Sequence, residues 1–371
     1  MIKFNLKYFW ALFTVFILTF PLIFACFTYR DVTQKNELVR VAEYTMNEMD
    51  FSFGTWGKGI MLEGLLYAYD STNDKRYLDF VRYWTDQSIY TQTNDGVFSH
   101  GETTIGDSSA IGISVLYFYN LTNDSFYLDA AVKNMKYLLN IPPRTIDGGL
   151  SHRASNVELW IDTVYMVCPF LAKLGIILEN DTLIDEAVSQ LLIHDKYLKD
   201  PKTSLYRHIW SQDGNYDDPN LWSRGIGWIT AAISEVLYII PNSHSNYSTL
   251  IKILQKSVHS ISQYQDPSGL WHTIINDSNT QLETSCSTLF AYSIALALNN
   301  SWIEDEGNKS VAIKAFNAVI NKVDPFGVVR GVSGGTGWNS YNTPIYDRAI
   351  SWGQGLFLKM YNLFDKLEWI T

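Results

Sequence analysis

The chain has 371 residues, enough for one large domain or two of ordinary size, and 47% of them are hydrophobic, which is sufficient for a sizeable core. Its formal net charge is −10, so it lacks the surplus of basic residues that neutralises phosphates, which argues against nucleic acid or an anionic membrane surface as the partner. Neither a P-loop nor the spacing of a zinc site is present.

The first 30 residues have the pattern of an export signal. Lys3 and Lys7 precede an apolar run over residues 8–27, which is typical of a signal peptide and is also long enough to span a bilayer. We therefore expect residues 1–30 to be a signal peptide or a signal anchor, and residues 31–371 to form a single domain outside the cell. The protein is then secreted, or it stays anchored in the membrane through residues 8–27 if the leader is not cut.

Seven Asn-x-Ser/Thr sequons follow the leader, more than chance gives for this content of Ser and Thr, and they hint at N-glycosylation. They are Asn120, Asn123, Asn180, Asn246, Asn276, Asn299 and Asn308. Cys168 and Cys286 lie in apolar helical contexts, and two cysteines make no disulfide framework, so free buried thiols are expected.

The sequence after the leader repeats with a period near 50 residues. Residues 72–79, Thr-Asn-Asp-Lys-Arg-Tyr-Leu-Asp, recur at 122–129 as Thr-Asn-Asp-Ser-Phe-Tyr-Leu-Asp, and a looser copy covers 180–186. Each copy follows an apolar helical segment and precedes an amphipathic one, and its Asn-Asp pair is typical of a turn followed by a helix N-cap. The predicted pairs of helices are 59–69 with 76–89, 111–119 with 126–139, 163–178 with the helix that 180–186 begins, 227–240 with 248–264, 285–298 with 306–323, and 351–364 with 31–49.

These six hairpins predict an all-α fold. Helices that are apolar all round require burial on both sides, whereas their amphipathic partners face water. An inner ring of six helices inside an outer ring of six, the (α/α)6 barrel or six-hairpin toroid, satisfies both conditions. An open helical solenoid is the alternative, but the pairing of the last apolar helix with the first amphipathic one favours closure.

The turns that lead into the apolar helices carry many of the aromatic and polar residues. In a closed toroid these turns converge on one end, so their Trp, Tyr, His, Arg and Asp side chains surround one concave mouth. Flat aromatic faces with polar edges suit sugar rings, while core packing is the alternative for any single tryptophan.

One carboxylate, Asp162, stands in the apolar and aromatic segment 160–170. Burial of an ionised Asp without partners costs several kcal/mol, so the side chain must be paired, or its pKa must rise well above the usual value of about 3.9. A carboxylic acid that stays protonated near neutral pH can act as a general acid. The alternative is an Asp that a backbone amide or a nearby arginine satisfies at a helix start.

Several motifs occur together with Asp162 in a characteristic order. They are residues 149–152, 160–166 with 169–172, 222–228, 265–272 and 282–285. In this order they resemble the unsaturated rhamnogalacturonyl hydrolases, glycoside hydrolase family 105, which are related to the unsaturated glucuronyl hydrolases of family 88. The resemblance extends from about residue 56 to residue 357, and it implies the same (α/α)6 barrel.

The resemblance implies an unusual hydrolysis. The substrate would be a lyase-generated pectin (rhamnogalacturonan) oligosaccharide with a 4,5-unsaturated galacturonate at its non-reducing end. A general acid protonates C4, charge develops at C5 and the ring oxygen, water adds at C5, and the hemiketal opens to release the sugar. Neither a metal nor an organic cofactor is required.

The resemblance also assigns roles to particular residues. Asp162 would be the general acid and also the base that activates water, and Asp107 would hold the sugar hydroxyls and the water, with an N-cap as its alternative. His208 and His152 would contact the unsaturated sugar, although a structural histidine is the alternative for each. Arg224 would meet the uronate carboxylate or a neighbouring charge, which a guanidinium does well in bidentate form.

Aromatic residues complete the expected substrate site. Trp228 and Trp160 would stack on the sugar or wall it, and the remaining expected contacts are Trp56, Trp271 and Tyr341. The family usually has Asn at the position of Ile226, so the sugar contact there departs from the family pattern.

Other interpretations remain open. The first is an unsaturated glucuronyl hydrolase or another (α/α)6 sugar enzyme, such as an epimerase or a hydrolase of saturated sugars, which would need two carboxylates at a set separation. The second is a non-catalytic carbohydrate-binding protein. The expected partner in every case is a small oligosaccharide.

Overall fold

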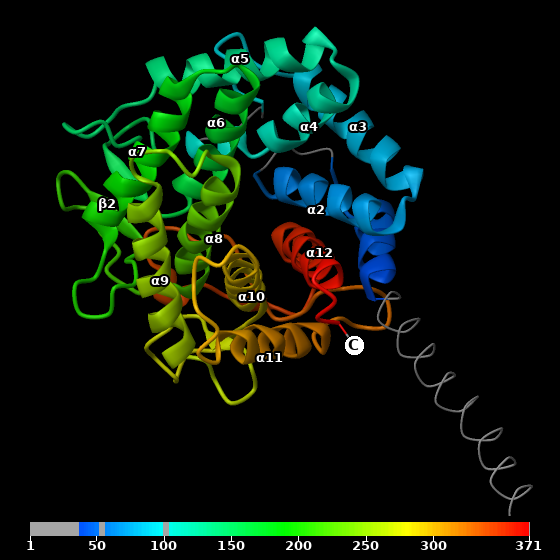
Figure 1. Ribbon diagram of the computed structural model, residues 1–371, viewed down its shortest axis with the longest axis vertical. Coiled ribbons are helices and arrows are strands. Elements are labelled where there is room, and N and C mark those ends of the chain that lie inside the picture. The colour runs from blue at the N-terminus through cyan, green and yellow to red at the C-terminus, as the bar shows by residue number, and fades with distance from the viewer. Residues whose placement is uncertain (1–36, 52–55, 99–103, 371) are drawn as a thin grey trace, which may run out of the picture.

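Apolar and amphipathic helices alternate along the chain and lie in two concentric layers in the computed structural model, which describes residues 37–51, 56–98 and 104–370 (Figure 1). The inner layer consists of α2 (Trp56–Thr72), α4 (Gly112–Thr122), α6 (Thr163–Ile177), α8 (Ser223–Ile239), α10 (Thr284–Asn299) and α12 (Ser351–Lys366). The outer layer consists of a helix over residues 37–48, α3 (Lys75–Tyr90), α5 (Ser125–Asn140), α7 (Asp181–Leu198), α9 (Tyr247–Gln263) and α11 (Asn308–Ile320).

The inner helices form a closed ring. Each packs against the next in chain order, and α12 packs against α2, so the last inner helix meets the first. The helix over 37–48 completes the last hairpin, because Gln354 Nε2 of α12 donates to Thr45 Oγ1 at 3.3 Å. The all-α (α/α)6 barrel that the repeats predict is confirmed, and the open solenoid is excluded.

Two glycines set the distance between α2 and α12. A Cβ on Gly355 would lie 2.2 Å from the carbonyl oxygen of Ile60, and a Cβ on Gly64 would lie 2.5 Å from Gly355 Cα. Neither position can hold a larger residue unless the two helices move apart.

The turns from inner to outer helices explain the repeated Asn-Asp pair. Asn73 and Asn123 adopt φ of 57° and 55°, in the left-handed region that asparagine tolerates better than most residues. Asp74 and Asp124 then cap the next helix, since each carboxylate accepts a backbone N–H two residues further on at 3.0 Å. The third copy is shifted by one residue, because Asn180 itself caps α7.

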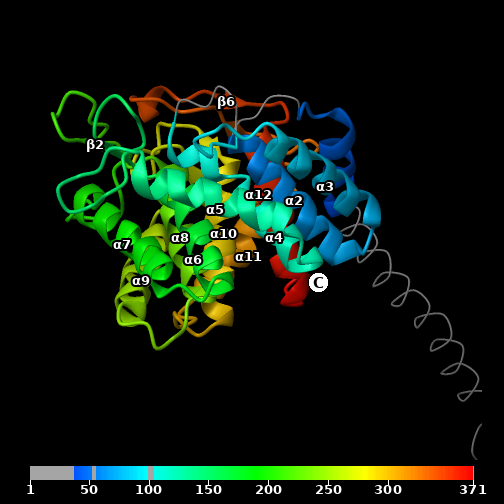
Figure 2. The same cartoon turned by 90° about the horizontal axis from the view of Figure 1, so that it is seen from above.

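Short strands cover the end of the barrel at which the inner helices begin (Figure 2). They form three antiparallel pairs, β1 (Glu158–Trp160) with β2 (Ile209–Ser211), β3 (Trp271–His272) with β4 (Leu282–Glu283), and β5 (Val332–Ser333) with β6 (Ile345–Tyr346). Two 3-10 turns, η1 (Gly106–Ser109) and η2 (Ser340–Asn342), lie in the loops before α4 and α12. We call this end the mouth, and the end at which the inner helices finish the far end.

The inner helix α8 begins earlier than the apolar periodicity predicts, at Ser223. Glycines lower helix propensity and favour a turn in a reading of the sequence alone. Here Gly225 serves packing instead, because a Cβ on it would lie 2.5 Å from Ile161 Cγ2. Arg224 therefore stands in the first turn of a helix, with a fixed direction.

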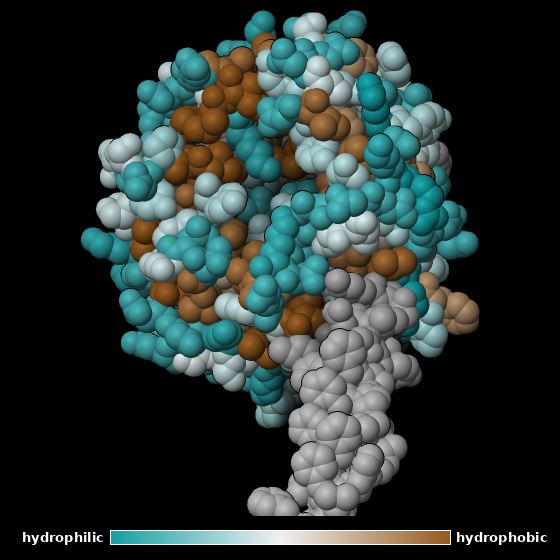
Figure 3. Space-filling view, turned by 45° about the vertical axis from the view of Figure 1, so that its right-hand side comes forward, coloured by the Kyte–Doolittle hydropathy of each residue, from teal (hydrophilic) through white to brown (hydrophobic). Residues whose placement is uncertain are grey.

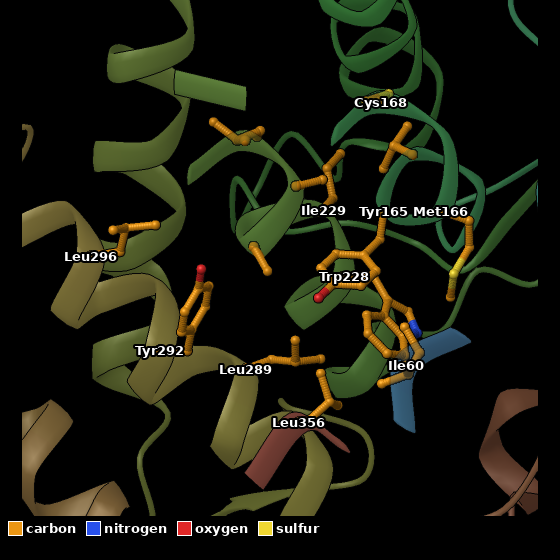
Figure 4. Packing of buried hydrophobic residues seen from close by; sticks show 14 of the residues in the cluster. Ile60, Tyr165, Met166, Cys168, Trp228, Ile229, Leu289, Tyr292, Leu296 and Leu356 are labelled. Atoms are coloured by element: carbon orange, nitrogen blue, oxygen red, sulfur yellow. The ribbon is translucent and has the colours of Figure 1, made fainter. Parts of the chain in front are cut away.

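A buried cluster of charges joins the inner helices. Lys359 Nζ of α12 donates to Glu63 Oε1 of α2 and to the hydroxyl of Tyr165 of α6, both at 2.9 Å, and also to Glu235 of α8. The ammonium lies 5.1 Å from the ring centroid of Tyr292 of α10, whose side chain Figure 4 shows in the surrounding core. Burial alone would lower the pKa of Lys359, but the two glutamates outweigh it and raise the pKa.

The far end of the barrel is hollowed beside this cluster. Two neighbouring hollows of about 420 and 440 Å³ share Tyr67 and Lys173 in their linings, and Figure 3 shows the depression with polar and apolar residues mixed around it.

Within the described ranges, no helix is both long and apolar enough to cross a membrane, and the leader predicted over 1–30 lies outside these ranges. Cys168 and Cys286 are buried and free, as predicted.

Candidate active site

Asp162 lies at the mouth, between the end of β1 and the start of α6. Its carboxylate makes no hydrogen bond to the amides of the first turn of α6, so it does not cap the helix. Oδ2 lies 3.4 Å from Nε2 of His208, within ion-pair distance, and neither atom has a hydrogen-bond partner in the described structure. The side chain of Asp162 is 16% exposed and that of His208 is 0% exposed, so Asp162 is the member of the pair that a substrate can reach.

The pair is ionic. Burial raises the pKa of Asp162, but the charges of His208 and then of Arg224 outweigh it, so the pKa lies below its usual range. Burial lowers the pKa of His208, but Asp162 and Asp218 outweigh it and raise the pKa. Of the two alternatives for a buried Asp, the structure therefore shows pairing, not a carboxyl with a raised pKa. Both pKa shifts favour a proton on His208 over a proton on Asp162.

His152 and Trp160 form a wall beside this pair. The imidazole of His152 stacks on the indole of Trp160 with ring centroids 4.5 Å apart, and its Nδ1 lies 2.9 Å from Thr163 Oγ1. Burial lowers the pKa of His152 to about 3, so this ring is neutral. Trp160 also meets His208 edge to face at 5.2 Å. The structure thus brings together three of the predicted site residues around Asp162.

Asp107 lies within η1, which packs against the start of α6. A Cβ on Gly106 would lie 3.0 Å from Thr163 Cγ2, so the turn that carries Asp107 is next to the turn that carries Asp162. Thr104 Oγ1 donates to Asp107 Oδ2, and the residue at the N-cap position of η1 is Ile105. The N-cap alternative for Asp107 is therefore not what the structure shows.

Arg224 binds the loop that follows β5. Its guanidinium donates to the carbonyl oxygens of Ser333 and Gly334 at 2.7 and 2.6 Å and to Thr336 Oγ1 at 3.1 Å. It lies flat over Trp222, 4.5 Å from the ring centroid. Burial lowers its pKa, opposed by Glu283 and Asp162. Most of its donors hold the loop, and only Nε lacks a partner among the described residues.

Trp56 and Trp228 lie below the loops, in the upper part of the inner ring. Trp56 stacks on Trp352 with centroids 4.4 Å apart and meets Trp228 edge to face at 6.0 Å. Trp228 is fully buried and packs against Tyr165, as Figure 4 shows. Trp228 therefore belongs to the core beneath the mouth and is not exposed at its surface, whereas Trp56 remains partly exposed. Ile226 is fully buried.

Two predicted contacts lie elsewhere. Trp271 is fully buried, its Nε1 donates to the carbonyl oxygen of Ile261 at 2.8 Å, and its ring packs on Phe290. It fills the space between α9 and α10, which is the core-packing alternative, and it does not line the mouth. Tyr341 is at the outer rim, where its hydroxyl donates to Asp277 Oδ2 at 2.9 Å beside a hollow of about 320 Å³.

The structure adds two residues that sequence reasoning missed. Asp218 accepts a hydrogen bond from Nδ1 of His208 at 3.0 Å, although nothing in its acidic loop distinguishes it from its neighbours in the sequence. Trp338 is half exposed at the rim, lies over Arg153 at 4.7 Å and donates from Nε1 to Glu158 Oε2. Its glycine-rich turn is a visible signal in the sequence. Across the described ranges, no group of three His, Cys, Asp or Glu side chains is arranged to hold a metal ion.

Comparisons with known proteins identify the family. The family model for Glycosyl Hydrolase Family 88 matches residues 29–363. The chain is 30% identical over 322 residues to the unsaturated rhamnogalacturonyl hydrolase YesR of Bacillus subtilis (strain 168), which covers 84% of this chain and 89% of that protein. It is 23% identical over 291 residues to the unsaturated 3S-rhamnoglycuronyl hydrolase of Alteromonas sp. (strain LOR), covering 75% and 70%.

Among solved structures, a possible member of the GH105 family from Salmonella enterica has the same fold, with a TM-score of 0.82, 24% identity and coverage of 91% of this chain and 95% of that one. The family suspected from the motifs is confirmed by the family model and by the relative from Bacillus subtilis. The chain belongs to glycosyl hydrolase family 88 and is a glycoside hydrolase.

Proposed function

We propose that this hydrolase releases 4,5-unsaturated galacturonate from the non-reducing end of lyase-generated rhamnogalacturonan oligosaccharides. The observation that carries the proposal is the pair of Asp162 and His208, in which a partly exposed carboxylate at the mouth lies 3.4 Å from a buried imidazole nitrogen that can supply a proton. The relative from Bacillus subtilis, named for this activity, supports the substrate class.

The chemistry requires one proton and one water. The proton passes from Nε2 of His208 to Oδ2 of Asp162 and from there to C4 of the vinyl ether, and positive charge develops at C5 and the ring oxygen. Water adds at C5 and returns its proton to Asp162, which restores the pair. The hemiketal then opens and frees the remaining sugar, so atoms and charge balance without a cofactor. Asp107, whose turn adjoins that of Asp162, holds the sugar hydroxyls and the water.

A second substrate deserves a test because another relative is named an unsaturated 3S-rhamnoglycuronyl hydrolase. Both names describe unsaturated, rhamnose-containing substrates. The names differ in the uronate and in the 3S label, so the two substrates can be compared directly on the same enzyme.

The test follows the loss of ultraviolet absorbance of the conjugated uronate when the protein acts on the unsaturated rhamnogalacturonan disaccharide. Asp162→Asn should lower kcat by about 100-fold or more, because general acid–base catalysis contributes about 10²–10⁴. The matched control is Asp129→Asn, an exposed carboxylate of the outer helix α5, which should keep full activity. Unchanged turnover in Asp162→Asn would exclude the assignment, and activity only on an unsaturated 3S-rhamnoglycuronyl substrate would change the substrate while keeping the chemistry.

A further inference from the structure

A second buried carboxylate, Asp218, lies behind His208 on the side opposite Asp162. Its side chain is 1% exposed, and Oδ2 lies 3.0 Å from Nδ1 of His208. Its other oxygen, Oδ1, accepts from the amide of Asn220 at 2.7 Å, so the carboxylate is fixed at both ends. His208 therefore stands between two carboxylates that come from different loops.

We propose that Asp218 is a positioning residue of the hydrolytic site: it holds the ring of His208 with Nε2 towards Asp162 and ties this orientation to the rim segment 338–342. The inference rests on the proposed function, because Asp218 would orient the histidine that supplies the proton to the vinyl ether. It concerns a residue that touches neither the sugar nor the reacting atoms.

The orientation follows from the two ring nitrogens. A carboxylate beside Nδ1 requires a proton on Nδ1, so only Nε2 can exchange a proton with Asp162. The ring cannot turn over easily, since the indoles of Trp222 and Trp160 lie 4.6 and 5.2 Å from its centroid. The position of Asp218 thus decides which nitrogen faces the acid.

The oxygen of Asp218 that contacts His208 also connects it to the rim. Asp218 Oδ2 also accepts the backbone N–H of Ser340 at 2.7 Å. Ser340 is the first residue of η2 and lies two residues after Trp338, which is 43% exposed at the rim. A shift of this segment would therefore loosen the hydrogen bond that holds His208.

The charge balance around His208 makes the effect measurable. The titratable groups that face it are Asp162 from the start of α6, Asp218 from the loop after β2, and His152 from the turn before β1, which is neutral. Removal of one of the two carboxylates leaves the imidazolium with a single counter-charge. Its proton is then lost at lower pH.

The experiment compares Asp218→Asn with Asp217→Asn. Asp217 belongs to the same loop and accepts from the backbone N–H of Ser211 at 2.6 Å, but it makes no contact with His208, so it reports loop disturbance alone. In Asp218→Asn we expect the basic limb of the kcat/KM profile to move to lower pH by about one unit or more. We expect kcat to fall about tenfold or more at neutral pH with KM within about threefold. Asp217→Asn should keep the wild-type profile.

A second readout does not depend on turnover. In protein labelled with ¹⁵N-histidine, the ring signals of His208 should titrate at lower pH in Asp218→Asn than in the wild type, by the same amount as the basic limb. An unchanged titration, or an equal loss of kcat in both variants with an unchanged pH profile, would overturn the proposal.

The experiments distinguish a failure of the proposed hydrolytic function from a failure of the positioning role of Asp218. If Asp162→Asn is inactive and Asp218→Asn behaves as the wild type, the function stands and the positioning role is lost. If the protein hydrolyses no unsaturated uronate, the ring titration still decides the role of Asp218. If Asp218→Asn does not fold, the wild type suffices, because ¹⁵N ring signals that show no proton on Nδ1 of His208 would contradict the proposal.

Discussion

A histidine that is removed from water stays neutral unless a carboxylate shares its proton, and the buried histidines of this barrel show both outcomes. His208, between two aspartates, has a raised pKa. His194 on α7 has no carboxylate partner, and burial lowers its pKa to about 4. Its Nδ1 lies 2.8 Å from the carbonyl oxygen of Gln190, and its Nε2 has no hydrogen-bond partner in the described structure.

His194 should therefore make stability depend on pH. Its folded pKa of about 4 lies below the unfolded value of about 6.5, so between these pH values the unfolded chain binds a proton that the folded chain does not. The free energy of unfolding then falls as the pH drops from about 6.5 towards 4, by about 1.4 kcal/mol per pH unit. His194→Leu should remove this part of the slope in denaturant titrations.

The control for this prediction is His259→Leu, because the ring of His259 is exposed on the outer helix α9. It should leave the slope unchanged. Equal slopes in the wild type and in His194→Leu would show that the buried ring is protonated in the folded protein.

Among single residues, the sequence allowed prediction of Asp162 as a site residue but not of the groups that pair with its carboxylate. The apolar surroundings of Asp162 require a partner or a raised pKa, and only coordinates distinguish the two, because His208 is 46 residues away along the chain. Asp218 could not be predicted, because it reaches His208 through the pairing of its loop with Ile209 of β2, which the sequence does not show. Trp271 was misassigned because a tryptophan in a turn can point to the mouth or into the space between layers, and the sequence pattern is the same.

At the scale of elements, the ring closes where helices α2 and α12 approach each other closely. A Cβ on Gly355 would lie 2.2 Å from the carbonyl oxygen of Ile60, so Gly355→Ala forces α12 away from α2. We expect a loss of about 1–3 kcal/mol in the free energy of unfolding, since overpacking outweighs the better helix propensity of alanine. The measurement is a denaturant titration.

Gly335→Ala serves as the comparison, because no atom lies within 4 Å of a Cβ at that position. It should change the free energy of unfolding by less than about 0.5 kcal/mol. A similar loss in both variants would mean that the α2–α12 contact does not limit the packing.

Most of the elements could be predicted from the sequence, because each inner helix is apolar all round and the turns before α3, α5 and α7 carry their own capping residues. The helix boundaries could not, as α8 shows. Its first two turns contain two glycines that lower helix propensity, and the reason for them is close packing between distant segments, of Gly225 against Ile161 and of Gly227 against Leu289.

For the whole molecule, Lys359 joins five of the six inner helices. Lys359→Met would leave Glu63 and Glu235 buried without a counter-charge, which should cost about 3–5 kcal/mol in the free energy of unfolding. Combining Lys359→Met with Glu63→Gln and Glu235→Gln should restore much of this loss, because no buried charge then remains.

Lys366→Met provides the reference on the same helix. Lys366 is more than half exposed and pairs with Asp70 at the surface, so its loss should cost no more than about 1 kcal/mol. If Lys359→Met cost as little, the buried cluster would contribute nothing to closure of the ring.

The direction of the helices fixes where the described part of the chain begins. The helix over 37–48 runs antiparallel to α12, since Thr45 near its end meets Gln354 near the beginning of α12. Residue 37 therefore lies at the far end, opposite the aromatic opening.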